Sequence, residues 1–267
     1  MQNYLYQDLY NLEDKHFWHL GKRELAKMLI CKFVNNGSCA SHVKKYSKIA
    51  TPNSDWARND NDIQIKILDI GCGAGKNLEM LESIGKAHGI DISPEAIKFC
   101  QMRKLKNVKL GESESTGFDN HSFDLVTMFD VLEHTDEEKT LNEVNRILKP
   151  QGYLLLTVPA YQFLWSRWDE VLKHKKRYVK SETEKILDGY RFKTIKSSYF
   201  FSYLLVPVMI TRWTKKLFNK KDYGSDFSIN NSFINFIAKL LNNIERLIIS
   251  YSSLPFGTSI IVIAKKK

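Results

Sequence analysis

The sequence is poor in cysteine, and the spacing of the few cysteines excludes two common uses of this residue. Cys31, Cys39, Cys72 and Cys100 form no CxxC pair and no cluster with the spacing of metal ligands. This pattern predicts a reduced cytoplasmic protein without a disulfide framework and without a zinc site; no bound metal is predicted. The N-terminus has no basic segment leading into an apolar core, so no signal peptide is predicted.

What is present is an ordinary globular composition with an uneven charge. Of the 267 residues, 43% are hydrophobic and 26% are charged, enough for one large α/β domain with an insertion or for two small domains. From Lys173 onward there are 19 basic and 6 acidic residues, against 21 and 24 in the first 172. Any anionic partner is therefore expected to meet the last third of the chain.

Strand and helix patterns alternate through the middle of the chain. Apolar spacing predicts helices within 1–35 and strands within 63–70, 86–92, 107–111, 124–131 and 152–158, with helices between the strands. This alternation predicts an α/β, Rossmann-like, mostly parallel sheet covered on both faces. The predicted organisation is an N-terminal helical cap and linker (1–62), a core (63–200), a hydrophobic and basic helical insertion (201–256) and a final core strand (257–267).

The first of these strands runs into a glycine-rich turn, ILDIGCGAG, which is expected to hold a ligand at the edge of the sheet. The turn is GxGxG, not the GxGxxG of dinucleotide folds, because Lys76 takes the place of the third glycine. The phosphate-binding GxxxxGK[ST] motif is absent as well. Asp69 just before the turn would repel a pyrophosphate and attract a cationic ligand. Asp91 and Glu112 follow the next two strands, so an adenosine-bearing ligand without phosphates is expected.

Five segments resemble, in order, the motifs of class I S-adenosylmethionine-dependent methyltransferases: ILDIGCGAG, GIDISPEAI, GESESTGFDNHSFDLV, FDVLEH and LKPQGYLLLTVP. The ordered set covers residues 63–160. The resemblance implies S-adenosylmethionine as the cofactor and a seven-stranded sheet whose last strand, at SIIVIA, is antiparallel.

The resemblance also assigns residues to the cofactor. From the methionine end to the adenine, these are Asp69, Gly71, Gly73, Asp91, Ile92 and Glu112. The predicted cofactor site is completed by Cys72, Ser113, Phe129, Asp130, Trp18 and Arg23. Cys72 is expected to be a small filler and not a nucleophile, and Trp18 and Arg23 are expected to close an N-terminal lid. The family more often has aspartate where Glu112 stands.

The acceptor end is predicted from FDVLEH and from VPAYQFLWSRWDEVLKHKKRY, Val158 to Tyr178. His134 is expected to be a general base or a substrate ligand, with a helix-capping or packing role as the alternative. A metal site formed by Glu133 and His134 is a further alternative for a catechol-like acceptor, although two adjacent ligands are weak evidence for one. The longer segment resembles a ubiquinone-biosynthesis-like branch of bacterial small-molecule methyltransferases, although Trp168 stands where that branch often has histidine and Lys176 where it often has arginine. Besides His134 and His174 as catalytic residues, the predicted acceptor site comprises Tyr161, Trp165, Trp168, Lys176, Arg177 and Tyr178. A solvated loop is the alternative reading of this segment.

The expected function is methyl transfer from S-adenosylmethionine to oxygen on a small-molecule or lipid-like acceptor, with nitrogen and carbon acceptors as alternatives. A nucleic-acid methyltransferase is disfavoured because the Asn/Asp-Pro-Pro-aromatic motif of base-amine enzymes is absent. A non-catalytic cofactor-binding protein is the remaining alternative.

The uncharged segment 197–211 is too short to span a bilayer and contains Pro207. It predicts an interfacial segment with peripheral contact at the inner face of the membrane, a substrate tunnel, or a buried subdomain.

Overall fold

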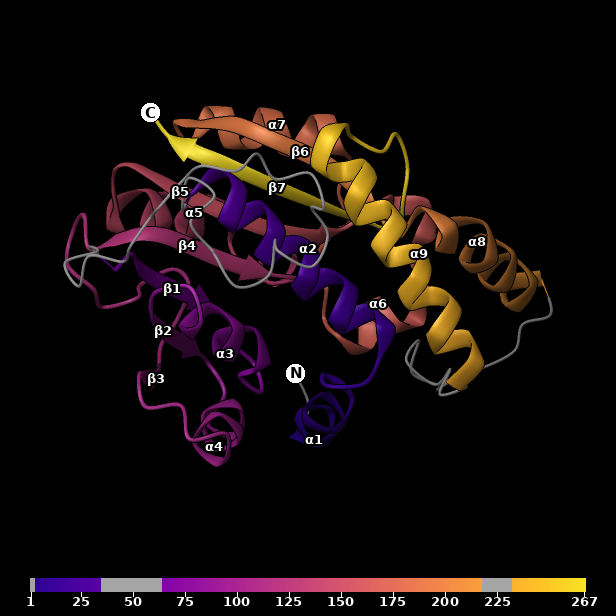
Figure 1. Ribbon diagram of the computed structural model, residues 1–267, viewed down its shortest axis with the longest axis horizontal. Helices are drawn as coiled ribbons and strands as arrows, with labels where there is room; N and C mark the ends of the chain where they lie inside the picture. The colour runs from indigo at the N-terminus through magenta and orange to yellow at the C-terminus, as the bar shows by residue number, and fades with distance from the viewer. Residues whose placement is uncertain (1–2, 35–63, 218–231) are drawn as a thin grey trace, which may run out of the picture.

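Seven strands form one sheet in the order β3-β2-β1-β4-β5-β7-β6. The computed structural model describes residues 3–34, 64–217 and 232–267 (Figure 1). The strands are β1 (Lys66–Ile70), β2 (Lys86–Asp91), β3 (Val108–Leu110), β4 (Phe123–Phe129), β5 (Leu148–Pro159), β6 (Phe192–Phe200) and β7 (Ser259–Lys266). The first five pair in parallel, and β7 is antiparallel to both of its neighbours. The predicted α/β sheet with an antiparallel last strand is confirmed.

Helices cover both faces of the sheet, as the apolar strands require. The crossover helices are α3 (Lys76–Glu82), α4 (Pro94–Met102), α5 (Glu137–Ile147) and α7 (Lys180–Gly189), and short helical turns are η2 (Leu132–His134), η3 (Gln162–Leu164) and α6 (Arg167–Val171). Leu78 of α3 and Cys100 of α4 belong to one buried cluster, whereas Leu141 of α5 and Leu187 of α7 belong to the cluster on the opposite face. The core is therefore divided by the sheet into two layers.

The N-terminal segment forms two helices, α1 (Asn3–Leu12) and α2 (Phe17–Phe33). The break between them is stabilised by His16, whose ring nitrogen accepts a hydrogen bond from the Trp18 amide at 3.3 Å. Leu25 and Leu29 of α2 join the same buried cluster as α3 and α4. The predicted N-terminal helices are therefore present, while the predicted linker, residues 35–62, lies outside the described residues.

The predicted insertion contains α8 (Ser202–Leu217) and α9 (Ser232–Tyr251), which separate β6 from β7. Figure 1 shows α9 beside α2, and Asn242 of α9 donates to the Phe17 carbonyl at 3.0 Å. A Cβ atom on Gly21 would lie 2.4 Å from the Asn242 side chain, so glycine permits this close approach. Within the described residues, no helix combines the length and apolar character needed to cross a membrane.

The expectation of four reduced thiols is wrong for Cys31, which takes part in a disulfide. Cys72 and Cys100 are free and buried. Spacing along the sequence could not reveal this, because a disulfide depends on which Cβ atoms the fold brings within about 4 Å.

Candidate active site

A cavity of about 1360 Å³ lies where β1, β2 and β4 end. Its walls come from α1 and α2, from the turns that follow β1 to β4, from the segment 159–177, and from one side of α8. Ligand pockets usually enclose about 300–1,000 Å³, so this cavity has room for a nucleoside-sized ligand together with a second molecule.

The glycine-rich turn after β1 forms one end of the cavity. Gly71 donates its N–H to the Ile90 carbonyl at 2.8 Å, and Gly73 donates its N–H to Asp91 Oδ2 at 2.9 Å. Both glycines adopt positive φ, +70° and +55°. A Cβ atom on Gly71 would also lie 2.4 Å from a methyl carbon of Val131. The turn therefore needs glycine both for its backbone conformation and for its close packing.

Asp91 ends β2 and faces the cavity. Its Oδ1 atom accepts hydrogen bonds from the Ser93 amide at 3.0 Å and from the Tyr6 hydroxyl at 3.4 Å. Burial raises the pKa of this carboxyl, although the backbone hydrogen bonds oppose the rise. Tyr6, from α1, thus brings the N-terminal segment onto the strand-end carboxylate. The sequence analysis did not identify Tyr6, because nothing in the local pattern reveals such a distant contact.

Asp69 lies just before the glycine-rich turn in the sequence, is buried, and is not among the residues that line the cavity. One carboxylate oxygen accepts a hydrogen bond from the Thr127 hydroxyl at 2.7 Å, and the other, fully buried, has no hydrogen-bond partner among the described residues. Burial raises the pKa of this carboxyl to about 7. Asp69 therefore joins the end of β1 to β4 through one oxygen and leaves the other unsatisfied.

The other predicted residues at this end line the cavity. They are Cys72, Ile92, Glu112 and Ser113. Ile92 is 71% exposed, so it presents an apolar face to whatever enters. The Cys72 thiol interacts with the thiol of Cys100, their sulfurs 3.9 Å apart; this contact and burial raise the pKa of Cys72 well above its ordinary value. The Cys72 thiol is thus protonated at neutral pH, and its role as a small filler and not a nucleophile stays a prediction.

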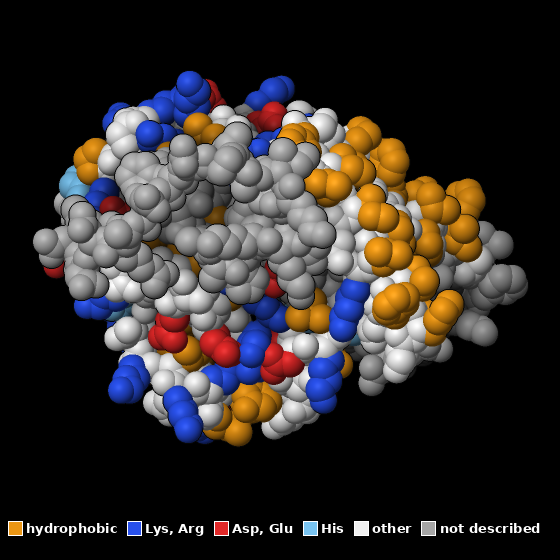
Figure 2. Space-filling view, viewed as in Figure 1, with side chains coloured by type: hydrophobic (Ala, Val, Ile, Leu, Met, Phe, Trp, Pro, Cys, Tyr) orange, Lys and Arg blue, Asp and Glu red, His pale blue; other side chains and the backbone are white. Residues whose placement is uncertain are grey.

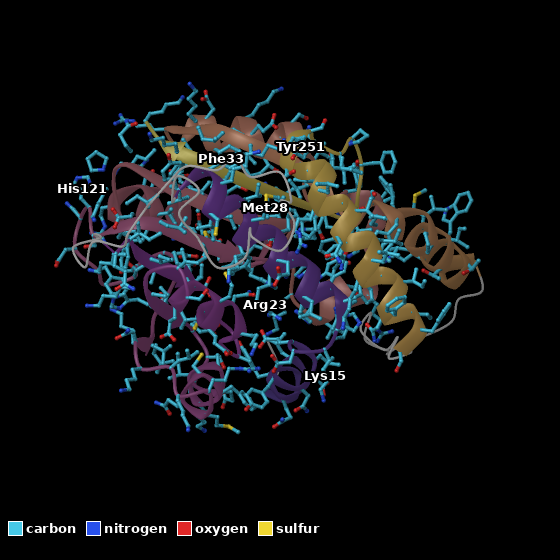
Figure 3. The ribbon with its side chains drawn as sticks, in the orientation of Figure 1. Lys15, Arg23, Met28, Phe33, His121 and Tyr251 are labelled. Atoms are coloured by element: carbon cyan, nitrogen blue, oxygen red, sulfur yellow. The ribbon has the colours of Figure 1, made fainter. Side chains whose placement is uncertain are left out.

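The N-terminal helices close the cavity through Trp18 and Lys22. Trp18 stacks on Phe201, with ring centroids 4.3 Å apart, and Lys22 forms an ion pair with Asp130. Burial opposes ionisation of Asp130, but Lys22 outweighs it and lowers the pKa of this carboxyl. Arg23, labelled in Figure 3, is not among the lining residues; it donates instead to the Glu13 carbonyl at 2.7 Å.

The predicted Phe129 and Asp130 both line the cavity next to this lid. Lys22 was not predicted as a site residue, although it lies within the EDKHFWHLGKR segment that contains Trp18 and Arg23. No sequence signal marks Lys22, because its burial against Asp130 appears only when α2 folds over the strand ends.

The two predicted catalytic histidines, His134 and His174, lie next to each other and beside Glu133. The rings of His134 and His174 are 4.7 Å apart, and ligand-type atoms of the three side chains lie within 4.8 Å of one another. Neither carboxylate oxygen of Glu133 has a hydrogen-bond partner among the described residues, and burial raises its pKa well above the ordinary value. Burial lowers the pKa of His134 to about 4, helped by His174. Three such groups could share a cation, but the predicted absence of a metal stays a prediction.

Asp169 is fully buried and holds His174 in place. Its Oδ1 atom lies 2.9 Å from His174 Nδ1 and accepts from Arg177 Nε at 2.7 Å, while Oδ2 accepts from the amide and hydroxyl of Ser166 at 2.8 and 3.0 Å. Burial opposes ionisation, yet His174 and Arg177 together keep the pKa of Asp169 well below its usual range. Asp169 therefore fixes the orientation of the His174 ring, a role that the sequence analysis did not assign.

The predicted acceptor residues separate into two groups. Trp165, Trp168 and Arg177 line the cavity. Tyr161, Lys176 and Tyr178 are not lining residues: Tyr161 stacks between Phe163 and Tyr199, Lys176 pairs with Glu137 at 2.8 Å, and Tyr178 donates to the same carboxylate at 3.2 Å. The predicted basic clamp is therefore reduced to Arg177, and α8 adds Arg212, which lines the cavity 4.0 Å from Asp169.

Comparisons with known proteins agree with this geometry. Residues 68–156 match the family described as "Methyltransferase domain". An uncharacterised protein of Methanocaldococcus jannaschii is 31% identical over 196 residues, which are 66% of this chain and 76% of that protein. The chain belongs to the class I S-adenosylmethionine-dependent methyltransferases.

Two further similarities are more limited: one covers only part of this chain, and the other has a low sequence identity. The mitochondrial ubiquinone biosynthesis O-methyltransferase of Candida albicans is 32% identical over 115 residues, covering 39% of this chain and only about a third (35%) of that protein. A crystal structure of an S-adenosylmethionine-dependent methyltransferase from Archaeoglobus fulgidus superposes with a TM-score of 0.53 at 21% identity, covering 91% of this chain and 94% of that one. At that identity the superposition shows the fold alone.

The residues of the methyltransferase fit its cofactor, S-adenosylmethionine. The bare turn at Gly71 and Gly73 admits a ligand against the backbone, and the Asp91 carboxylate at the end of β2 is an acceptor suited to ribose hydroxyls. The Asp130 carboxylate lines the cavity near the expected methionine end, and the buried Asp69 lies just before the turn. No phosphate-binding arrangement is needed, and these carboxylates would oppose one.

Proposed function

We propose that the methyltransferase transfers a methyl group to a hydroxyl of a small, apolar or lipid-like acceptor, with His174 as the general base. The observation that supports this most is the 2.9 Å contact between His174 Nδ1 and the buried, ionised Asp169. A carboxylate at Nδ1 favours the tautomer that carries its proton there, so Nε2 is left as the acceptor.

The charges around His174 favour the deprotonation of a neutral acceptor. His134, with its pKa near 4, is neutral at pH 7, and burial raises the pKa of Glu133, so the charged forms of both neighbours are disfavoured. Arg177 and Arg212 both line the cavity and lie 2.7 and 4.0 Å from Asp169. A hydroxyl that gives up its proton would leave a partial negative charge, which these cations stabilise.

The walls of the acceptor end support an apolar substrate. Trp165, Trp168 and Leu164 contribute from the segment after β5, and Leu204 and Val208 contribute from α8. Such a surface suits a ring or an isoprenoid chain better than a sugar or a nucleotide. An acceptor of this kind would be met at the inner face of a membrane by a cytoplasmic enzyme, as the sequence analysis expects.

The protein's own part in the reaction is alignment and proton transfer. When bound, S-adenosylmethionine supplies an activated methyl group and retains its sulfur as a thioether. His174 takes the hydroxyl proton as the new oxygen–carbon bond forms, Asp169 holds the resulting imidazolium, and the lid formed by Trp18 and Lys22 excludes water. Alignment alone serves a nitrogen or carbon acceptor equally well, so these acceptors are the alternatives.

The test is transfer of label from tritiated S-adenosylmethionine into a lysate of the source organism. Products are separated into organic-extractable, small polar and macromolecular fractions, and Asp91→Ala sets the background. Label in the organic fraction as a methoxy group, identified by NMR, is the expected result. An N-methyl or C-methyl product would contradict the proposed base chemistry. Label in a nuclease-sensitive fraction would contradict the acceptor class as well.

A further inference from the structure

The α8 and α9 helices carry an unusual amount of exposed apolar surface. On α8 the exposed large apolar residues are Val206, Met209, Ile210 and Trp213. On α9 they are Phe233, Ile234, Phe236, Ile237, Leu240, Ile244, Leu247, Ile248 and Tyr251. Figure 2 shows apolar side chains gathered at the end of the molecule where these helices lie. A contiguous apolar surface of this extent marks an interaction site, whereas scattered single residues do not.

This apolar face has no exposed acidic group of its own. Glu245 is the one acidic residue in the sequences of α8 and α9, and it is buried, accepting from the amides of Phe201 and Ser202 at 2.7 and 2.6 Å. Lys239 of α9 is exposed, and Lys32 lies over the Tyr251 ring, 5.7 Å from its centroid, where α2 and α9 end (Figure 3). Arg246 of α9 is paired with the exposed Glu24 of α2 at 3.1 Å, and the other exposed charges named here, Lys239 and Lys32, are basic.

The inner side of α8 belongs to the active site. Leu204, Val208, Thr211 and Arg212 line the cavity, while Val206, Ile210 and Trp213 of the same helix face outward. One helix thus separates the acceptor end of the cavity from the exposed apolar face. A molecule that enters past α8 would leave an apolar environment and meet His174 without crossing open water.

We propose that the outer face of α8 and α9 docks the enzyme on the surface of an anionic phospholipid bilayer. Apolar and aromatic side chains would enter the boundary between headgroups and acyl chains, and the basic residues would meet anionic headgroups. The proposal rests on the proposed function only in that it lets a lipid-dissolved acceptor reach the cavity. A helix that spans the membrane is not needed.

Charge favours a bilayer over a second copy of the chain as the partner. A two-fold dimer would bring the same face against itself. Lys239 would then approach another basic, apolar face that offers no carboxylate from α8 or α9. An anionic bilayer satisfies both the apolar and the charged part of the surface.

The test is co-sedimentation of the full chain with vesicles, without cofactor or acceptor, so that its result does not depend on methyl transfer. Vesicles contain equal parts of phosphatidylglycerol and phosphatidylcholine, or phosphatidylcholine alone. The wild type should bind the anionic vesicles, and more weakly in high salt. Changing Trp213→Ser and Phe236→Ser, 76% and 65% exposed, should lower the partition coefficient by about tenfold or more. Met102→Ser, on α4 and 61% exposed, is the matched control and should bind like the wild type.

A second measurement tests whether the double variant is folded, and three outcomes would overturn the proposal. Calorimetric binding of S-adenosylhomocysteine should be unchanged in the double variant, which shows that it is folded. Wild-type protein that stays in the supernatant, or a double variant that binds vesicles like the wild type, would overturn the proposal. A wild-type dimer that the double variant converts to a monomer, without vesicle binding, would identify the face as a contact between copies and would overturn it too.

Discussion

Lys22 of α2 forms an ion pair with Asp130, the residue that follows β4, and both side chains line the cavity. The pair joins the N-terminal cap to the strand end where the methyl group is expected to be transferred. Asp130 is held further by the Thr157 hydroxyl, which donates to its other oxygen at 2.7 Å. The N-terminal helices are thus held at the expected reaction site by an ion pair as well as by apolar packing.

Removing Lys22 should therefore destabilise the protein by leaving a carboxylate in a site that disfavours charge. We expect Lys22→Met to lower the free energy of unfolding by about 1–3 kcal/mol, measured by urea denaturation. Lys15→Met, at an exposed position near the same cap (Figure 3), is the control and should change it by less than about 0.5 kcal/mol. Adding Asp130→Asn should recover part of the loss. Equal stability of the two lysine variants would contradict this account.

Glycine at position 71 is required by its conformation and by its neighbour. Gly71→Ala would place a Cβ atom at a φ of +70° and 2.4 Å from Val131. The strain and the displacement of the turn should weaken S-adenosylhomocysteine binding by about tenfold or more, because about 1–2 kcal/mol is stored in the backbone alone. Binding is measured by calorimetry. Gly189→Ala, where no atom lies within 4 Å of the new Cβ, should bind like the wild type; if both variants bind equally, the turn does not hold the cofactor.

The proposed base predicts a specific kinetic effect. His174→Ala should lower kcat by about 10²–10⁴-fold while leaving cofactor binding within about twofold, because the ring acts on the acceptor proton and not on the cofactor. Asp169→Asn should also lower kcat, because His174 loses the carboxylate that orients its ring and fixes its tautomer. An unchanged kcat in His174→Ala would show that alignment alone suffices.

A second comparison separates His174 from its neighbour. His134→Gln keeps a polar side chain of similar size and should lower kcat much less than His174→Ala, because no carboxylate lies at hydrogen-bond distance from His134 among the described contacts. If His134→Gln is the more damaging of the two changes, the assignments of base and neighbour are reversed.

Much of the fold follows from local sequence patterns. The strand–helix alternation over 63–160 and the final apolar strand predict the sheet, because each element buries its own periodic face. The expected cofactor end of the cavity is predictable for the same reason, since Gly71, Gly73 and Asp91 lie at fixed offsets from strand ends. Site residues that lie within one short strand–turn segment can therefore be predicted from the sequence of that segment alone.

Long-range contacts could not be read in this way. Tyr6, Lys22 and Arg212 reach the cavity only because α1, α2 and α8 fold over it. Tyr178 was predicted to contact the acceptor, but its backbone pairs with Ala160 and its ring enters the core. Arg177, one residue earlier, points into the cavity, so an irregular segment gives neighbouring side chains different directions that periodicity does not predict.

The low pKa of His134 predicts how stability depends on pH. Burial lowers this pKa from 6.5 to about 4, so between these values the unfolded chain binds a proton that the folded protein does not. The free energy of unfolding should therefore fall as pH falls from 6.5 toward 4, by at most about 1.4 kcal/mol per pH unit from this residue. His134→Gln lacks the group and should lose less stability than the wild type between pH 7 and 5, by urea denaturation. Between pH 7 and 8 the difference between the two proteins should be constant, because His134 is neutral in both states. A difference that is also constant down to pH 5 would contradict the low pKa of His134 in the folded protein.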